Sequence, residues 1–463
     1  MRNMLAQIAS SGSNLGLIVL AAAFGSSTSM PVHAGGFTSG NIVVLQIGTG
    51  SNVLMLRSVA CFLQEYTTNG NLVQTIPLPV SSTDANYPLT LYIGSTTPRE
   101  GILKRSVDGR YLTFGGYGVN PGFQDPAASN PVVSPRVVGR VDWSGNINST
   151  TALTNSPVPT PPPNGSSYHM VSAISTDGSR IWIAGSVRGC CTELLSQDVR
   201  YATLGSQTFT AVATNVNTRA VNIFNNQLYV STAASPRFGV ATVGTGLPTS
   251  SIGGAPSLLP GFPTSGIHSS YDFWFSDDTT LYVADSGNAG TGGGIQKWRF
   301  SEGQWLLQYI LLNNGTTNMP VYAMTGTMDG NSNAVLYATS GANFDNKLIT
   351  LTDKGADSVA TVIADAPTNT AFRGVAFAPV AGIAGPKLTG VIITGNDLRL
   401  NWDTTGGTTN FVQASGSLSS GSFSDISGPI YIPGGSPATT NYTETNGANN
   451  PARYYQIRSV SEE

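Results

Sequence analysis

A short phrase returns roughly every fifty residues along this chain of 463 residues. Each copy has an apolar strand, a turn built on Asp, Asn or Gly, and a second strand that reads Leu-Tyr-Val-Ala or close to it. The copies occupy Ser106–Gly116, Ser175–Gly185, Phe224–Ala233, Phe275–Asp285 and Thr327–Gly341. A repeat of this length built only from strands predicts an all-β fold, the β-propeller.

An inner strand precedes each turn phrase, and the start of that strand marks the start of a unit. We place the six starting points at Glu100, His169, Arg219, His268, Val321 and Arg373. The intervals between them are 69, 50, 49, 53 and 52 residues, each long enough for four short strands. This spacing predicts six blades. The long first interval leaves seven blades as the alternative.

The two ends of the repeat region complement each other. The last unit, Ala371–Pro379, supplies an inner strand and then stops, whereas Asn41–Ile47 reads as a second strand without an inner one. The hairpin formed by Cys61–Tyr66 and Leu72–Leu78 follows it. We therefore predict that the last strand completes the blade begun by the first segment, which removes the free sheet edges.

The pattern changes after Pro379. The segment Pro386–Asn401 gives two strands around a Thr-Gly-Asn turn, an early Trp402 follows, and Arg453–Val460 is a late Tyr-rich strand. We predict a propeller over residues 35–380, a linker over 381–386 and a small β-sandwich over 387–463.

Several of these segments resemble known families. The phrase LYVADSGN at Leu281–Asn288 is similar to the NHL repeat, and Thr218–Ala233 and Ala371–Pro379 resemble segments of uncharacterised secreted bacterial β-propeller proteins with NHL-like repeats. The C-terminal segment resembles a fibronectin type III module. The resemblance implies the fold and an extracellular location, and it carries over no catalytic residue.

The N-terminus predicts export. Arg2 supplies a positive charge, Leu15–Phe24 is an apolar run too short to span a bilayer, and Val32-His33-Ala34 offers small residues at a cleavage site. We expect a signal peptide over residues 1–34 and a secreted, extracellular protein without membrane insertion. The alternative for this segment is a buried N-terminal helix.

The charge composition limits the classes of partner that the protein can bind. Charged residues make up 10% of the chain, against about 25% in an average protein, and the formal net charge is −3. No basic stripe is present to bind a phosphate backbone, so we expect no nucleic-acid partner. We expect an extracellular glycan or protein instead.

The chain has three cysteines. In an oxidising compartment the adjacent Cys190 and Cys191 are candidates for a vicinal disulfide, and two reduced thiols are the alternative. Cys61 lies in a strand-like run and is expected to be a buried thiol. The spacing of a Cys/His zinc site is absent.

Propeller geometry places the starting ends of the inner strands, and the loops between second and third strands, on one face of the channel. Our candidate ligand-binding residues on this entrance face are Tyr117, His169, Arg188, Arg219, His268 and Arg373. With Glu100, the two histidines offer a metal site or a general base as alternatives to a polar rim. The turn aspartates fall on the opposite face and are expected to accept backbone hydrogen bonds.

Asp285 and Asn288, followed by a Gly-rich run, are the candidates for a calcium site, and a polar loop is the alternative. We otherwise expect no cofactor. No Gly-x-Ser-x-Gly elbow and no phosphate-loop Lys occur in the chain.

These observations favour a non-catalytic secreted binding protein that recognises a glycan, peptide or cell-surface component on the entrance face. One alternative is an extracellular carbohydrate-active enzyme, a lyase or hydrolase, for which His169, Tyr168, His268, Tyr271 and Arg373 supply candidate groups. The other is a structural subunit of a surface layer or filament.

Overall fold

The computed structural model describes residues 35–51, 56–92, 100–155, 167–188, 199–214, 217–341, 344–381, 386–405, 408–417, 423–433, 437–449 and 453–461. The predicted signal peptide, the adjacent pair Cys190 and Cys191, and most of the predicted linker lie outside these residues. Within them the protein is all-β, with two short 3-10 helices, η1 (Ala289–Thr291) and η2 (Gly447–Asn449), and no α-helix. No helix in the described ranges is long and apolar enough to cross a membrane.

Six four-stranded antiparallel sheets, consistent with propeller blades, are built from residues 42–377. We number five of them along the chain. The first sheet contains β6 (Lys104–Arg105), β7 (Tyr111–Tyr117), β8 (Arg136–Asp142) and β9 (Ile147–Leu153). The second sheet contains β10 (Ser167–Ser175), β11 (Arg180–Arg188), β12 (Val199–Thr203) and β13 (Thr210–Ala213).

The next three sheets repeat this order, in which each strand pairs with the one that follows it. The third sheet contains β14 (Thr218–Phe224), β15 (Gln227–Ala234), β16 (Arg237–Thr242) and β17 (Ser257–Leu258). The fourth sheet contains β18 (Ser270–Asp277), β19 (Thr280–Asp285), β20 (Gly294–Ser301) and β21 (Gln304–Leu311). The fifth sheet contains β22 (Val321–Met328), β23 (Ala334–Ser340), β24 (Lys347–Thr352) and β25 (Thr361–Asp365).

The sixth sheet, which we call the closing sheet, joins the two ends of this region. It contains β26 (Ala371–Phe377), β1 (Ile42–Ile47), β3 (Cys61–Tyr66) and β4 (Leu72–Pro77). Strand β26 pairs antiparallel with β1, from Ile42 opposite Phe377 to Ile47 opposite Ala371. The predicted pairing of the last strand with the first is thus observed. A further small pair joins β2 (Ser58–Val59) to β5 (Leu91–Tyr92).

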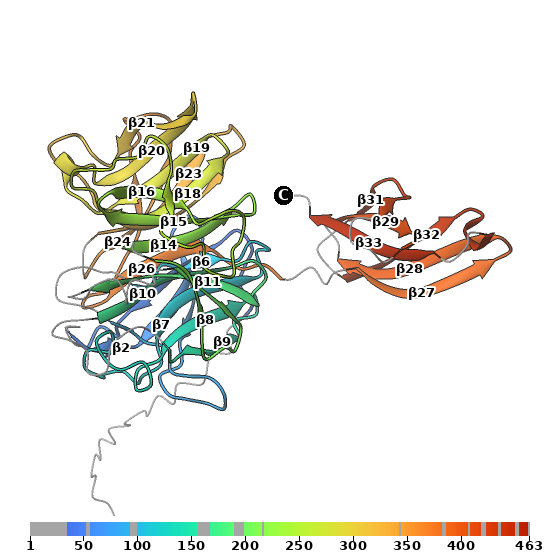
Figure 1. Cartoon of the computed structure of the whole chain (residues 1–463), viewed down its shortest axis with the longest axis horizontal. Coiled ribbons are helices and arrows are strands. Elements are labelled where there is room, and N and C mark those ends of the chain that lie inside the picture. The colour runs from blue at the N-terminus through green and yellow to red at the C-terminus, as the bar shows by residue number, and fades with distance from the viewer. Residues whose placement is uncertain are drawn as a thin grey trace, which may run out of the picture.

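The first strands of the six sheets form a closed cycle. In the order β26, β6, β10, β14, β18 and β22, each strand contacts the next, and β22 contacts β26. Figure 1 shows β26 beside β6, although the two are far apart in the sequence. These inner strands therefore surround a common axis. Sheets that stand three steps apart in the cycle face each other across that axis.

Each pair of neighbouring sheets shares its own apolar core. The strands alternate in which face each side chain points to, so a central sheet buries side chains against both neighbours. Representative members of the six cores are Leu45 with Phe114, Val138 with Met170, Trp182 with Val221, Val240 with Phe273, Ile295 with Met324, and Leu348 with Val375. Each fully buried side chain of this size contributes about 1.5–3 kcal/mol.

The repeated turns behave as their sequence predicts. Asp177 Oδ1 accepts hydrogen bonds from the backbone N–H groups of Ser179 and Arg180, at 2.8 and 3.2 Å. Asp277 and Asp329 accept equivalent bonds from the residues that follow them. These carboxylates are therefore used to shape hairpin turns.

The strands after β26 pair only among themselves in the described residues. One sheet contains β27 (Lys387–Thr394), β28 (Asp397–Thr405) and β32 (Pro437–Glu444). The other contains β29 (Thr408–Ser415), β30 (Ser424–Asp425), β31 (Ile430–Ile432) and β33 (Tyr454–Ser461). Trp402 is fully buried in the core that includes Leu400 and Val412, and its indole N–H donates to Asn410 Oδ1 at 2.8 Å.

A buried ion pair crosses the central channel. Lys104 on β6 and Asp272 on β18 belong to sheets that face each other across the axis, and their charged groups form a hydrogen-bonded salt bridge. Asp272 also accepts the N–H of Phe273 at 2.8 Å and that of Met324 at 3.1 Å. The pair therefore ties three inner strands together at the centre of the ring.

We predict that Lys104→Met lowers the free energy of unfolding by about 3–5 kcal/mol, because it leaves the Asp272 carboxylate buried without its counter-charge. Urea unfolding followed by tryptophan fluorescence measures the loss. In the matched control, the double variant Lys104→Met/Asp272→Asn recovers part of it, because no buried charge remains and the single amide oxygen can still accept one of the two backbone bonds. An unchanged unfolding midpoint in Lys104→Met would show that the pair does not stabilise the ring.

Candidate functional site

Six side chains, one from the starting end of each inner strand, meet at one end of the channel. We call this set the entrance ring. Its members, in the order of the cycle, are Glu100, His169, Arg219, Tyr271, Tyr322 and Arg373. Five of the six are buried, with exposed fractions between 2% and 7%, and Tyr322 is half-buried. So many buried polar side chains in one place are unusual in a folded protein, because each normally needs a hydrogen-bond or charge partner.

Glu100 precedes β6 and is held by three donors. Its Oε1 accepts the hydroxyl of Tyr117 and lies 2.7 Å from His169 Nδ1, and its Oε2 accepts the backbone N–H of Tyr92 at 3.0 Å. Burial and the Glu100 charge raise the pKa of Tyr117 well above its ordinary value, so the hydroxyl remains a donor. The glutamate is therefore a paired and oriented carboxylate.

The turn after Glu100 depends on a glycine. Gly101 has a φ of 87°, in the left-handed region, and a Cβ at this position would lie 3.1 Å from atoms of both Arg373 and Leu45. Glycine thus allows β6 to approach β26 closely. This approach brings Glu100 near Arg373, although they are far apart in sequence.

The other side of the ring is made of aromatic rings and guanidinium groups. The Arg219 guanidinium carbon lies 4.3 Å from the centre of the Tyr271 ring, and Tyr271 meets Tyr322 edge to face at 4.5 Å between centroids. Arg373 lies close enough to Glu100, Tyr322 and Tyr271 to interact with them electrostatically. The ring is therefore continuous from Arg219 through the two tyrosines to Arg373 and Glu100.

The two arginines of the ring lack hydrogen-bond partners in the part of the chain that the structure describes. Nε and Nη1 of Arg219 and Nη2 of Arg373 are buried and donate to no group there. Burial lowers the pKa of Arg373 to about 10, still far above neutral pH, so the guanidinium is charged. A buried cation without hydrogen-bond acceptors is energetically costly.

His268 does not join the entrance ring. Its imidazole is half-buried and packs on the Phe238 ring at 5.4 Å, before the start of β18. Within the described ranges no group of three or more His, Cys, Asp and Glu side chains is placed to hold a metal ion. The convergence of His169, His268 and Glu100 on a metal, which we weighed from the sequence, is therefore not observed.

The remaining candidates are placed as follows. Tyr117 is fully buried behind Glu100 and donates to it, whereas the side chain of Arg188 lies outside the described residues. Cys61 is a free, buried thiol, as expected, and burial raises its pKa.

The candidate calcium ligands, Asp285 and Asn288, make local hydrogen bonds. Asp285 is fully buried at the end of β19, and its carboxylate accepts the N–H of Gly287 at 2.8 Å and that of Ser269 at 3.1 Å. Asn288 precedes η1, and its backbone N–H donates to the Thr291 hydroxyl at 3.1 Å. Both carboxylate oxygens of Asp285 thus accept backbone donors, as in a hydrogen-bonded loop.

The clearest hollow on the axis lies at the opposite mouth of the channel. It has a volume of about 390 Å³ and is lined by residues of all six inner strands, among them Lys104, Asn222, Trp274, Thr325 and Phe377. Lys104, which pairs with Asp272, is one of the residues that line this hollow.

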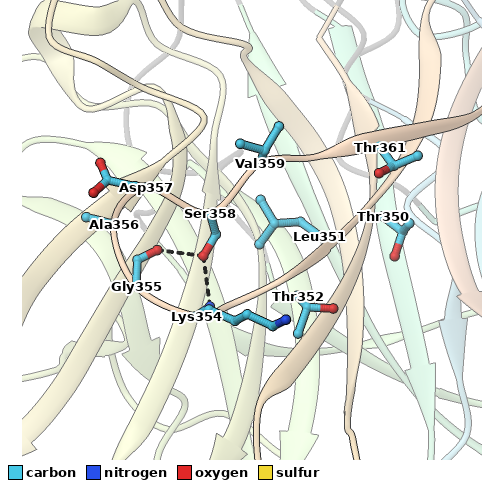
Figure 2. A pocket seen from close by; sticks show the side chains of 10 residues that line it. All are labelled: Thr350, Leu351, Thr352, Lys354, Gly355, Ala356, Asp357, Ser358, Val359 and Thr361. Carbon is cyan, nitrogen blue, oxygen red and sulfur yellow. Dashed lines mark hydrogen bonds between the residues drawn. The ribbon is translucent and has the colours of Figure 1, made fainter.

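A second hollow, of about 450 Å³, lies between β24 and β25 (Figure 2). Ser358 Oγ shapes its loop by accepting the N–H of Lys354 and donating to the carbonyl of Gly355, at 2.8 and 2.7 Å. Its charged lining residues are Lys354 and Asp357 only, so it brings together no reactive set.

Sequence reasoning misplaced two members of the ring. The predicted starting point Val321 is the first residue of β22, and His268 lies two residues before β18 begins at Ser270. The ring members on these two strands are nevertheless Tyr322 and Tyr271, which contact each other. With this correction the intervals from His169 through Arg219, Tyr271, Tyr322 and Arg373 become 50, 52, 51 and 51 residues. This more even spacing could have identified Tyr271 and Tyr322 from the sequence. It was hard to recognise because the ring positions hold different residue types in different repeats.

Comparisons with known proteins show no close relationship. The sequence matches no protein-family model and no curated protein. Among solved structures, a protein from Lactobacillus plantarum is 12% identical over 87% of this chain and 99% of its own, with a TM-score of 0.36.

Two further structures are similarly distant. The PQQ-bound aldose sugar dehydrogenase from Streptomyces coelicolor is 8% identical over 74% of this chain and 96% of its own, with a TM-score of 0.36. AztD from Citrobacter koseri is 12% identical over 88% and 99%, with a TM-score of 0.29. None of these similarities assigns a ligand, cofactor or activity to this chain.

The Asp285 loop gives a pH-dependent prediction. Burial raises the pKa of Asp285 from 3.8 to about 6, so the folded protein binds more protons than the unfolded chain between these values. Protonated Asp285 therefore stabilises the fold at low pH, and this stabilisation is lost as the pH rises through about 6. The resulting decrease in the free energy of unfolding is up to roughly 3 kcal/mol.

We expect Asp285→Asn to remove this contribution to the pH dependence, measured as urea midpoints from pH 4 to pH 7. The exposed Asp357→Asn variant is the matched control and should keep the parent profile. An Asp285→Asn profile parallel to that of the parent would contradict the prediction.

Proposed function

We propose that this chain is a secreted, non-catalytic binding protein whose six sheets are the six blades of a β-propeller with NHL-like repeats. The signal peptide over residues 1–34 would direct its export. Residues 387–463 would form a fibronectin type III-like β-sandwich that spaces or docks the propeller. The ligand would be an extracellular glycan, peptide or cell-surface component bound at the entrance ring.

The observation that carries this proposal is the set of unused donors in the entrance ring. The two guanidinium groups of Arg219 and Arg373 are buried and make no hydrogen bond to a described residue. The buried charge of Lys104, by contrast, is paired with Asp272. Polar groups kept unsatisfied at the end of a channel favour ligand recognition over a structural role.

The tyrosines add groups suited to the same task. Burial and the neighbouring Tyr271 raise the pKa of Tyr322, so its hydroxyl stays protonated at neutral pH and can donate a hydrogen bond. Together Tyr271 and Tyr322 present aromatic surface beside the arginines. Apolar surface with a few convergent polar groups is typical of ligand sites.

We predict that Tyr322→Phe weakens binding of the ligand about 2- to 10-fold, because it removes one neutral hydrogen bond and keeps the ring. A glycan array and a pull-down from extracellular material identify the ligand, and titration calorimetry measures the change. Tyr431→Phe, at an exposed tyrosine of β31, is the matched control. Binding that survives Tyr322→Phe unchanged but is lost in Tyr431→Phe would place recognition in the C-terminal strands.

One contact favours a second candidate, a carbohydrate-active enzyme. Glu100 orients the His169 imidazole at 2.7 Å, which is the arrangement of a general base and its carboxylate partner. Incubation with acidic polysaccharides, followed by an assay for reducing ends or unsaturated products, tests it. Product formation by the parent that is abolished in His169→Gln would replace the binding proposal.

A further inference from the structure

We infer that the entrance ring binds a carboxylate group of its ligand between Arg219 and Arg373, and that an acidic sugar of the uronate type supplies it. This inference rests on the proposed ligand site and adds the chemistry that the site recognises. It is carried by the hydrogen bonding, placement, charge and exposure of the two arginines.

The hydrogen bonding of the two arginines differs from that of a structural arginine in the same protein. Arg136 is fully buried, and its guanidinium donates to backbone carbonyls that include those of Ser134 and Ser129, at 2.6 and 3.1 Å. Arg219 and Arg373 are 7% and 5% exposed and donate to no described group. The fold therefore gives both Nη groups of Arg136 carbonyl acceptors and leaves only its Nε without a described partner, whereas the guanidinium groups of Arg219 and Arg373 reach no described carbonyl.

The two arginines are placed so that a ligand group can lie between them. Arg219 is on β14 and Arg373 is on β26, which stand three steps apart in the cycle and so face each other across the axis. Tyr322 interacts electrostatically with both. A group bound beside Tyr322 and Tyr271 would therefore have a guanidinium on either side.

The charges of the ring favour a single negative charge on the ligand. Two guanidinium groups stand against one carboxylate, Glu100, whose oxygens already accept from Tyr117, Tyr92 and His169. One positive charge is thus left uncompensated, which suits a monoanion. Guanidinium groups bind carboxylates through charge-assisted hydrogen bonds.

The limited exposure of the arginines favours a narrow group over a flat one. A carboxylate that projects from a sugar ring can reach a guanidinium that retains only a few per cent of its surface. The Tyr271 and Tyr322 rings then offer aromatic surface to the sugar and a hydroxyl to its own hydroxyls. An acidic sugar uses all of these groups at once.

Binding of glucuronate and galacturonate to the purified full chain tests the inference, with glucose as the neutral counterpart. Chloride and sulfate at matched ionic strength serve as simple anions. Thermal unfolding and titration calorimetry report binding. We expect the uronates to raise the melting temperature and glucose to leave it unchanged, because the buried cations gain an acceptor only from the former.

The variants Arg219→Gln and Arg373→Gln should each weaken uronate binding about 10- to 100-fold, the usual effect of losing hydrogen bonds to a charged group. Without ligand, each should melt at or above the parent temperature, because a buried cation without hydrogen-bond acceptors has been removed. Arg299→Gln, on the exposed face of β20, is the control of equal charge change. Arg136→Gln is the contrast, and it should melt lower because its carbonyl partners lose their donor.

Equal stabilisation by chloride or sulfate would overturn the carboxylate assignment, as would an acidic peptide that binds where uronates do not. A clear drop in the ligand-free melting temperature of Arg373→Gln would assign the arginine a structural role and overturn the inference. Tight binding of a neutral glycan that weakens in Tyr322→Phe but not in the arginine variants would overturn this inference alone. Absence of any ligand sensitive to Tyr322→Phe would overturn the proposed function itself.

Discussion

The structure depends on one closure, the antiparallel pairing of β26 with β1. This pairing fills a sheet that neither end of the chain can complete, and it leaves every inner strand with a neighbour on both sides of the cycle. The six apolar cores lie between neighbouring sheets, so each core requires both of its sheets. Opening the ring at this point would expose the two cores that flank the closing sheet.

Closure also decides which side chains meet. The starting ends of all six inner strands converge on the axis, so Glu100 and Arg373 become neighbours although most of the repeat region separates them in sequence. The same convergence joins Lys104 to Asp272 across the channel. Function in such a ring is therefore assembled from single residues of separate repeats.

The polar groups near the axis fall into two kinds. Glu100 and the pair of Lys104 with Asp272 are satisfied by protein atoms, as are both Nη groups of Arg136, and their role is to fix the ring. Arg219 and Arg373 are also buried, and three of their guanidinium nitrogens have no described hydrogen-bond partner. Because unsatisfied buried charge destabilises a fold, its retention at one end of the channel is the feature on which the proposed binding role rests.

The sequence alone determined the repeat, the strand-turn-strand units, the turn aspartates such as Asp177 and the pairing of the chain ends, because these follow from local periodicity and turn chemistry. It also selected His169, Arg219 and Arg373 as candidates. Only the tertiary structure decided that Tyr271 and Tyr322 complete the ring while His268 packs elsewhere. The reason is that the packing of six inner strands around the axis decides which residue of each strand faces the channel. The sequence of one strand alone leaves that residue uncertain by a few positions.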